Sequence, residues 1–402
     1  MSDRKKKYSW WMVTGVLALL FSCDIKKNEV SPSESYFRIF DNNKIGGNLY
    51  PIDIQQNADG GFTILGSANL WDTYIIQTDA FGKITFDSVY AQYVNPVGDL
   101  AQSADRSSCT FFAMDRISRG TYLLKINAAG FKLDTVNFFP QLSFLLHSSP
   151  TPDGGYIVES SAIRSDDDIR ILVAKLSSQH QVEWDNEYDA LENISDKIYG
   201  HVYRRGVRYP FKTGFISNSL GYYVNIFKEY RLTTQFIDLA GNDKGQLDGY
   251  QYQGGVSAIQ HYSENTFTLA GFTLEKSYIL PMQNVDANAT QSLSSLPARE
   301  LFDVDSRAEV VMKSIQIGGK SIVIYGSTTK NKRIILQGYD PTTGNFIGQK
   351  YIGSGFGYEL GNFVTTNDGG LAVLAKTNIA GRYDRLCLFK LSQSDIKVLS
   401  GN

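Results

Sequence analysis

The feature that most constrains this chain is a tripeptide, Asp-Gly-Gly, that recurs in front of short apolar strands. It occurs at Asp59–Gly61, Asp153–Gly155 and Asp368–Gly370. Similar apolar runs without the tripeptide bring the number of such strands to seven, spaced about 45–67 residues apart. A unit repeated at this spacing indicates a propeller or a solenoid.

The clearest strand of each unit is rich in β-branched and aromatic residues and is bounded by Gly, Asp or Asn, which is typical of a buried strand. These strands are expected at 62–65, 110–113, 156–158, 222–226, 267–270, 322–325 and 371–375. A further apolar run follows each of them about ten residues later, and most units carry another run after that. We therefore predict an all-β fold, a seven-bladed β-propeller of four-stranded antiparallel blades, with strands A to D counted outward from the axis.

The turns between strands C and D repeat as well. Asp79–Gly82, Asn127–Gly130 and Asp238–Gly241 share one spacing. Asp or Asn caps such a turn with its own side chain, and Gly supplies the positive φ that reverses the chain. No unit has the alternating oxygen ligands of a calcium loop, so we expect no metal at these aspartates.

The last unit has no strand D of its own, because the chain ends soon after its strand C. The segment 36–40 has the apolar character needed to supply it. We predict that this N-terminal strand completes the last blade and closes the ring, which leaves only short, protected edges.

The N-terminus has the pattern of an export signal. Arg4–Lys7 is basic, and 10–21 is apolar but too short to span a bilayer comfortably. The sequence Leu20-Phe21-Ser22-Cys23 resembles the lipobox of bacterial lipoproteins, although Phe21 is bulkier than is usual there, and an ordinary signal peptide is the alternative. The resemblance implies a lipoprotein signal peptide at 1–22, lipidation at Cys23, a flexible tether over 23–35 and a propeller domain over 36–402.

Charge and cysteine content exclude some classes of protein. Removing residues 1–22 takes away one acid and four bases, so the formal charge changes from −2 to −5. A mildly acidic body has no general affinity for nucleic acid. Cys109 and Cys387 lie within apolar strands of distant units, so we expect small buried thiols instead of a disulfide.

The Asp-Gly-Gly units over about 36–392 resemble the propeller repeats of secreted and surface lipoproteins of Gram-negative bacteria. The resemblance implies the fold and a location: the protein would be lipid-anchored to the outer membrane, on a side of that membrane that the sequence does not specify. It carries over no catalytic residues, because function on a shared fold depends on the particular site.

Candidate binding residues lie on the longer B–C and D–A connections, which share one side of a propeller, while the short A–B and C–D turns share the other. The longest connection, about 190–212, interleaves aromatic and basic residues that suit sugar stacking, anion binding or a protein contact. A solvated loop is the alternative, and Trp71 could equally pack between blades. The candidate set is Trp71, Arg116, Arg119, Tyr199, His201, Tyr203, Arg204, Arg205, Arg208, Tyr209, Arg382 and Tyr383.

The sequence carries no local metal, phosphate-loop or nucleophile-elbow motif, so we expect no cofactor and name no catalytic residue. The leading hypothesis is a non-catalytic binding or scaffolding module with an envelope protein complex or a polysaccharide as partner. The alternative is a glycan-active hydrolase or lyase, which would need carboxylates from different blades at the channel mouth. Candidates near the expected innermost strands are Asp53, Asp99, Glu309 and Glu359.

Overall fold

Antiparallel β-strands dominate the computed structural model of the chain, which describes residues 31–41, 45–129, 131–165, 168–205, 209–250, 254–354, 357–379 and 381–401. The chain divides into two units, Met1–Pro32 and Ser33–Asn402. The predicted lipidation site Cys23 and the candidate Arg208 lie outside the described residues.

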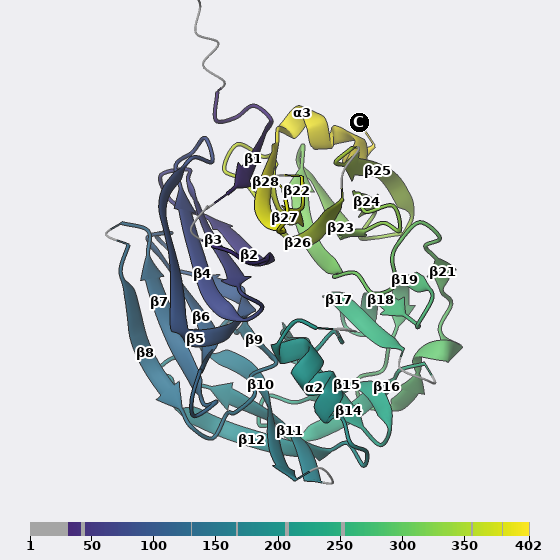
Figure 1. The fold of residues 1–402 in the computed structure, drawn as a ribbon. Helices are drawn as coiled ribbons and strands as arrows, with labels where there is room; N and C mark the ends of the chain where they lie inside the picture. The colour runs from purple at the N-terminus through teal and green to yellow at the C-terminus, as the bar shows by residue number, and fades with distance from the viewer. Residues whose placement is uncertain are drawn as a thin grey trace, which may run out of the picture. The chain divides into compact units, whose positions relative to one another are not determined.

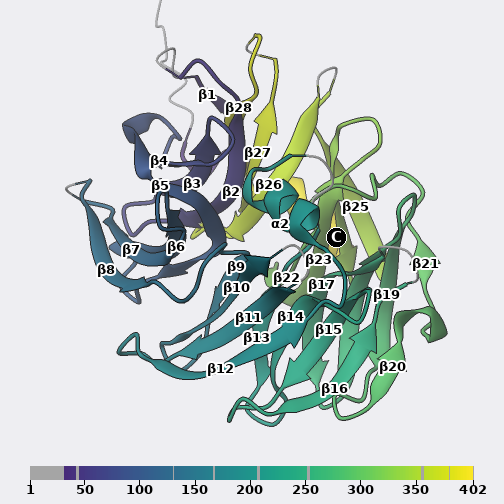
Figure 2. The same ribbon diagram turned by 60° about the horizontal axis from the view of Figure 1, so that its bottom comes forward.

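The described strands form sheets that follow one another in chain order (Figures 1 and 2). The first sheet contains β2 (Leu49–Gln56), β3 (Phe62–Ala68), β4 (Asp72–Thr78), β5 (Ile84–Gln102), β6 (Ser108–Asp115), β7 (Thr121–Asn127) and β8 (Leu133–Phe139). The next contains β9 (His147–Pro150), β10 (Tyr156–Ser165), β11 (Asp168–Leu176) and β12 (Val182–Asp189). The third contains β13 (Thr213–Ser217), β14 (Gly221–Lys228), β15 (Arg231–Ile237), β16 (Asp243–Asp248) and β20 (Thr290–Ser292).

Three four-stranded sheets complete the series. They are β17 (Gly255–Ser263), β18 (Thr266–Phe272), β19 (Ser277–Asn284) and β21 (Arg299–Glu300); β22 (Val311–Ile317), β23 (Lys320–Thr328), β24 (Ile334–Tyr339) and β25 (Phe346–Ile352); and β26 (Tyr358–Thr365), β27 (Leu371–Thr377), β28 (Arg385–Leu391) and β1 (Tyr36–Phe40). The short helices are α2 (Ser195–Val202), α3 (Gln393–Ile396), η1 (Leu293–Ser295) and η2 (Lys397–Ser400).

Each predicted strand B falls inside an observed strand: β3, β6, β10, β14, β18, β23 and β27. The first sheet has seven strands because β5 runs for 19 residues and pairs with β4 through its first half and with β6 through its second. The sheet therefore contains two units of the repeat joined by one unbroken strand.

The N-terminal segment pairs where the sequence analysis expected. β1 runs antiparallel to β28 from Tyr36 opposite Lys390 to Phe40 opposite Leu386, and it completes the last sheet (Figure 1). The last sheet also packs on the first. Leu374 and Leu388 share a buried cluster with Ile54 and Ile64.

The Asp-Gly-Gly turns have a specific physical basis. In the turn before β10, the Asp153 carboxylate accepts a hydrogen bond from the Gly155 N–H at 3.1 Å, and Gly154 has a φ of +82°. A Cβ on Gly155 would overlap the carbonyl oxygen of Leu176 on the neighbouring strand. Gly154 is therefore needed for the left-handed backbone conformation, and Gly155 is needed because the neighbouring strand β11 comes so close.

Two of these turns are also held by a buried lysine. Lys175, 1% exposed, donates to Asp153 at 2.7 Å, and Lys390, 2% exposed, donates to Asp368 at 2.8 Å. The ammonium groups neutralise the turn carboxylates, and the pKa of Asp153 stays at about 2 although burial acts to raise it. This contact ties each A–B turn to strand C of its own sheet.

One segment differs from expectation. The stretch 285–297 is rich in Asn, Ser, Ala and Thr, a composition that predicts a mobile loop, but in the structure it contains β20 and η1. β20 pairs in parallel with β16, so this insertion from one sheet covers the outer edge of the preceding sheet. Leu293 is fully buried, and this explains why a segment of low apolar content is nevertheless ordered.

Candidate functional site

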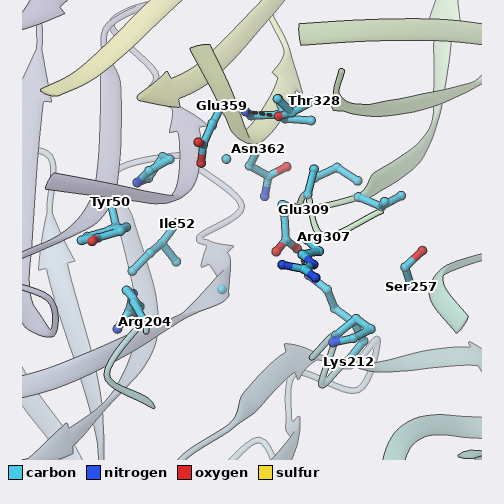
Figure 3. A pocket seen from close by; sticks show the side chains of 18 of the residues that line it. Tyr50, Ile52, Arg204, Lys212, Ser257, Arg307, Glu309, Thr328, Glu359 and Asn362 are labelled. Atoms are coloured by element: carbon cyan, nitrogen blue, oxygen red, sulfur yellow. Dashed lines mark hydrogen bonds and ion pairs between the residues drawn. The ribbon is translucent and has the colours of Figure 1, made fainter. Parts of the chain in front are cut away.

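A cavity of about 560 Å³ lies at the inner strands of the sheets (Figure 3). Its wall includes residues of β2, β5, β9, β17, β22 and β26 and the segment just before β13. The described lining contains five basic and four acidic side chains: Arg204, Lys212, Arg307, Lys332, Lys376, Asp99, Asp305, Glu309 and Glu359. Three of the four carboxylates that the sequence analysis singled out are therefore in this wall.

Most of these charges are already paired with one another. Lys212 Nζ lies 2.6 Å from Glu309, and Lys332 Nζ lies 3.2 Å from Asp305. Glu359 receives both Lys376 at 3.1 Å and Lys332 at 3.3 Å. Burial acts to raise the pKa of Glu359, but the two ammonium groups outweigh it and hold that pKa below its ordinary value.

Arg307 is the exception among the basic side chains of the wall. It is exposed, and it forms no ion pair or side-chain hydrogen bond with any residue that the structure describes. Figure 3 shows Lys212, Arg307 and Glu309 gathered on one side of the open space, with Tyr50 and Arg204 across it. The cavity thus presents one guanidinium group that is available to an incoming anion.

His147 lines the same cavity as a neutral side chain. Its Nδ1 accepts a hydrogen bond from the Thr213 N–H at 3.2 Å, which leaves the proton on Nε2. Burial, followed by the nearby Lys212, lowers its pKa to about 4. At neutral pH His147 can therefore donate a hydrogen bond but has no free nitrogen to act as a general base.

Asp53, the fourth singled-out carboxylate, lies behind the wall and is 1% exposed. It accepts hydrogen bonds from the Leu100 N–H at 2.6 Å, the Ile54 N–H at 2.7 Å and Asn362 Nδ2 at 2.6 Å. Burial raises its pKa to about 6 against the opposing effect of Lys313. Since Asn362 belongs to β26 and Leu100 to β5, this carboxyl joins inner strands of the first and last sheets.

The long connection before β13 is more buried than a solvated recognition loop would be. His201, Arg204 and Tyr209 are 8%, 7% and 6% exposed. Arg204 donates to the carbonyl of Pro96 at 2.7 Å and to Asn95 Oδ1 at 3.2 Å, and His201 Nε2 lies 2.9 Å from the carbonyl of Leu146. These three candidates belong to the cavity wall, and α2 provides the local framework that positions His201.

Five further candidates gather in one aromatic and guanidinium cluster on the loop side. The Trp71 ring lies 4.7 Å from the Tyr203 ring, with the guanidinium groups of Arg116 and Arg119 at 5.0 and 4.9 Å from the Trp71 centroid. Tyr199 stands 6.1 Å from Tyr203. The sequence analysis expected these separate segments to share a side, and their contacts place them together.

The cluster does not offer a bare stacking platform. Trp71 is partly buried against the core, with its ring contacted by a tyrosine and two arginines. Arg116 is itself paired with Asp72. Tyr199, 37% exposed, and the exposed Arg205 are the more accessible members of this region.

Arg382 and Tyr383 lie in the connection between β27 and β28. The Arg382 guanidinium is 5.3 Å from the Tyr383 ring, and Arg385 approaches the same ring at 5.6 Å. No described contact links this pair to the Trp71 cluster. The candidates thus separate into a cavity wall, the Trp71 cluster and this pair.

The lysines of the cavity were missed by the sequence reasoning. Lys376 carried a usable signal, because it directly follows the apolar run 371–375 within a buried strand. Lys332 and Arg307 lie in ordinary polar connections, and nothing local marks them. Among the described residues no group of histidine, cysteine and acidic side chains could hold a metal, and no described helix is both long and apolar enough to cross a membrane.

Comparison with known proteins adds little about function. No protein-family model and no curated protein matches the chain. The chain is similar to a solved structure of core factor from S. cerevisiae, with 10% identity and a TM-score of 0.51, covering 89% of this chain and 60% of that one. It is also similar to the β-propeller domain of the Trilobed protease from Pyrococcus furiosus, with 11% identity and a TM-score of 0.44, covering 87% and 96%.

Proposed function

We propose that this chain is a seven-bladed β-propeller, closed by β1, that binds an anionic ligand in its central cavity without catalysing a reaction. The division of the seven-stranded sheet at β5 supports the blade count. The shared cluster of Leu374, Leu388, Ile54 and Ile64 and the Asp53–Asn362 hydrogen bond support closure between the last sheet and the first.

The observation that carries the binding proposal is the unpaired guanidinium of Arg307 in a wall whose lysines are already occupied. A carboxylate, sulfate or phosphate group on a glycan or peptide would form an ion pair with this guanidinium, since guanidinium binds such groups through two parallel hydrogen bonds. The amide of Asn362 and the Nε2–H of His147 add neutral polar groups to the same wall.

Binding is better supported than glycan hydrolysis. A glycosidase needs one carboxyl group with a raised pKa beside a second carboxylate. Of the lining carboxylates, Glu309, Asp305 and Glu359 are ion-paired, and Asp99 accepts a hydrogen bond from Ser149 at 3.0 Å. Asp99 helps burial to raise the pKa of Asp53, but Asp53 is 1% exposed and its oxygens already accept three hydrogen bonds behind the wall, so this carboxyl group cannot reach a glycosidic bond in the cavity.

We further propose that Cys23 is lipidated and holds the domain at the outer membrane of a Gram-negative bacterium. The support is the resemblance of Leu20–Cys23 to a lipobox and the polar stretch that separates it from β1. Mass spectrometry of the mature N-terminal peptide tests this directly.

Calorimetric titration with oligogalacturonate and with sulfated heparin oligosaccharides tests the binding proposal. We expect one of these anions to bind and Arg307→Ala to weaken it at least tenfold, because hydrogen bonds to charged groups contribute about 1.5–3 kcal/mol. Lys83→Ala, an exposed lysine on a C–D turn, is the matched control and should leave affinity unchanged. Equal affinity of Arg307→Ala and wild type, or no affinity for either anion, would contradict the proposal.

A further inference from the structure

The side of the domain formed by the C–D turns carries apolar side chains at its tips. We call this side the turn face and define it by Phe81, Phe131 and Leu239, which are 40%, 39% and 45% exposed. Each belongs to the same kind of turn in a different unit of the repeat. Large apolar side chains at these three turns are not needed for the turn itself, which depends on Asp or Asn and Gly.

Contacts between neighbouring units of the repeat place these turns on one side. Phe131 stacks on Phe86, at the start of the outer half-strand of the preceding unit, with ring centroids 5.0 Å apart. In the same way Trp184, early in β12, donates to the carbonyl of Leu239 at 3.2 Å. Each tip therefore lies against the beginning of the outermost strand before it.

The N-terminal end of β1 is fixed on this same face. Tyr36 donates to the carbonyl of Ala80 at 3.0 Å, and Arg38 Nε donates to the carbonyl of Phe81 at 3.1 Å. Ser35 accepts a hydrogen bond from the Ser392 N–H at 2.7 Å, next to α3. The chain that leads from Cys23 therefore meets the described domain at the turn face.

The distance from Cys23 to this point is limited by chain length. Twelve residues, 24–35, separate Cys23 from β1. Even a fully extended chain of this length spans at most about 40 Å. A lipid on Cys23 would hold the turn face close to the bilayer.

Two carboxylates of the A–B turns on this side of the domain are paired with lysines, which lessens their repulsion from an anionic surface. The carboxylates of Asp153 and Asp368 are neutralised by Lys175 and Lys390. Lys83 and Lys132 stand beside the apolar tips and are exposed. Apolar tips with adjacent lysines suit the boundary between headgroups and acyl chains.

We propose that the turn face lies against the phospholipid bilayer, with Phe81, Phe131 and Leu239 entering the headgroup region, and that the loop side with the cavity wall points away from it. This inference rests on the lipidation proposed above. Exposure alone would favour the opposite orientation, because Ile117 and Phe302 on the loop side are 90% and 72% exposed.

Depth-dependent fluorescence quenching on the full lipidated chain tests the proposal. Single cysteines at Phe81, Phe131 or Leu239, and at Ile117 or Phe302 as controls, would carry an environment-sensitive dye in phosphatidylethanolamine–phosphatidylglycerol vesicles containing brominated acyl chains. The native Cys109 and Cys387 are buried, and burial raises both thiol pKa values, so they should not react.

We expect at least twofold stronger quenching at the three turn-face positions than at the two controls. Equal or stronger quenching at Ile117→Cys or Phe302→Cys would overturn the proposal, as would its absence everywhere in protein that mass spectrometry shows to be acylated. Protein without acyl chains would overturn this proposal and the lipidation together, while anion binding in the cavity is measured independently and would be unaffected.

Discussion

Glu159 provides the sharpest test of the energetics of this fold. It lies in β10, directly opposite Val173 of β11, and it is 0% exposed. Neither carboxyl oxygen has a hydrogen-bond partner among the described residues. Burial raises its pKa well above the ordinary value of 4.5.

The perturbation is Glu159→Gln, which keeps the shape and removes the titration. Because the folded-state pKa is raised, the group's contribution to stability is fully present below pH 4.5 and is lost as pH rises through the folded-state pKa. Each pH unit within that window costs the wild type about 1.4 kcal/mol. Since the unfolded carboxyl is only partly ionised near pH 5, the loss between pH 5 and pH 6 is at most about 1.2 kcal/mol.

Urea unfolding of both proteins at pH 5 and pH 6 measures this difference. We expect the free energy of unfolding of Glu159→Gln to gain up to about 1.2 kcal/mol on that of the wild type over this interval. Glu159→Leu should be more stable still, because it also removes an unsatisfied polar group, which costs about 1–3 kcal/mol when buried. Parallel pH profiles for Glu159→Gln and wild type would refute the reasoning, because they would mean that the carboxylate is ionised and partnered in the fold.

Two other substitutions test features of the repeat and of the inner strands. Gly155→Ala should lower the free energy of unfolding by about 1–3 kcal/mol, as overpacking does, because the added Cβ would overlap the carbonyl of Leu176. Gly46→Ala is the control, because Gly46 has open space around it. Equal urea midpoints for the two variants would contradict the argument. Asp53→Asn should flatten the pH dependence of Tm between pH 4 and pH 6. The reason is that the raised Asp53 pKa of about 6 makes wild-type stability fall as pH rises through this range. If thermal melts of the variant show the same slope of Tm against pH as the wild type, Asp53 does not titrate there.

The strands were predictable because their signal is local. Alternating β-branched and aromatic residues bounded by Gly, Asp or Asn depend only on neighbours in sequence, and so all seven strongest runs, from 62–65 to 371–375, fall within observed strands. The pairing of Tyr36–Phe40 with β28 could be predicted because the last unit lacked a strand D and this segment has the apolar character to supply it.

The site was less predictable because the type of a residue does not determine whether its side chain is exposed. Arg204 and Arg205 are adjacent, yet the first is buried against Asn95 and Pro96 while the second is exposed. The difference depends on where β5 brings its backbone, some hundred residues earlier in the chain. The ion pair of Lys332 with Glu359 likewise depends on how two sheets are placed, whereas Lys376 lies directly opposite Glu359 in the pairing of β27 with β26.

The pairing of Tyr36 with Lys390 also sets the order in which this protein can mature. Most strands pair with near neighbours, so successive sheets can form while synthesis continues. The final sheet cannot, because its outermost strand β1 is made before all the strands that lie between it and its partner β28. Closing so large a loop adds entropy cost and slows folding. Until that late event the edges of β1 and β28 stay open to other chains, so a product truncated before β28 would display an unsatisfied edge at each end.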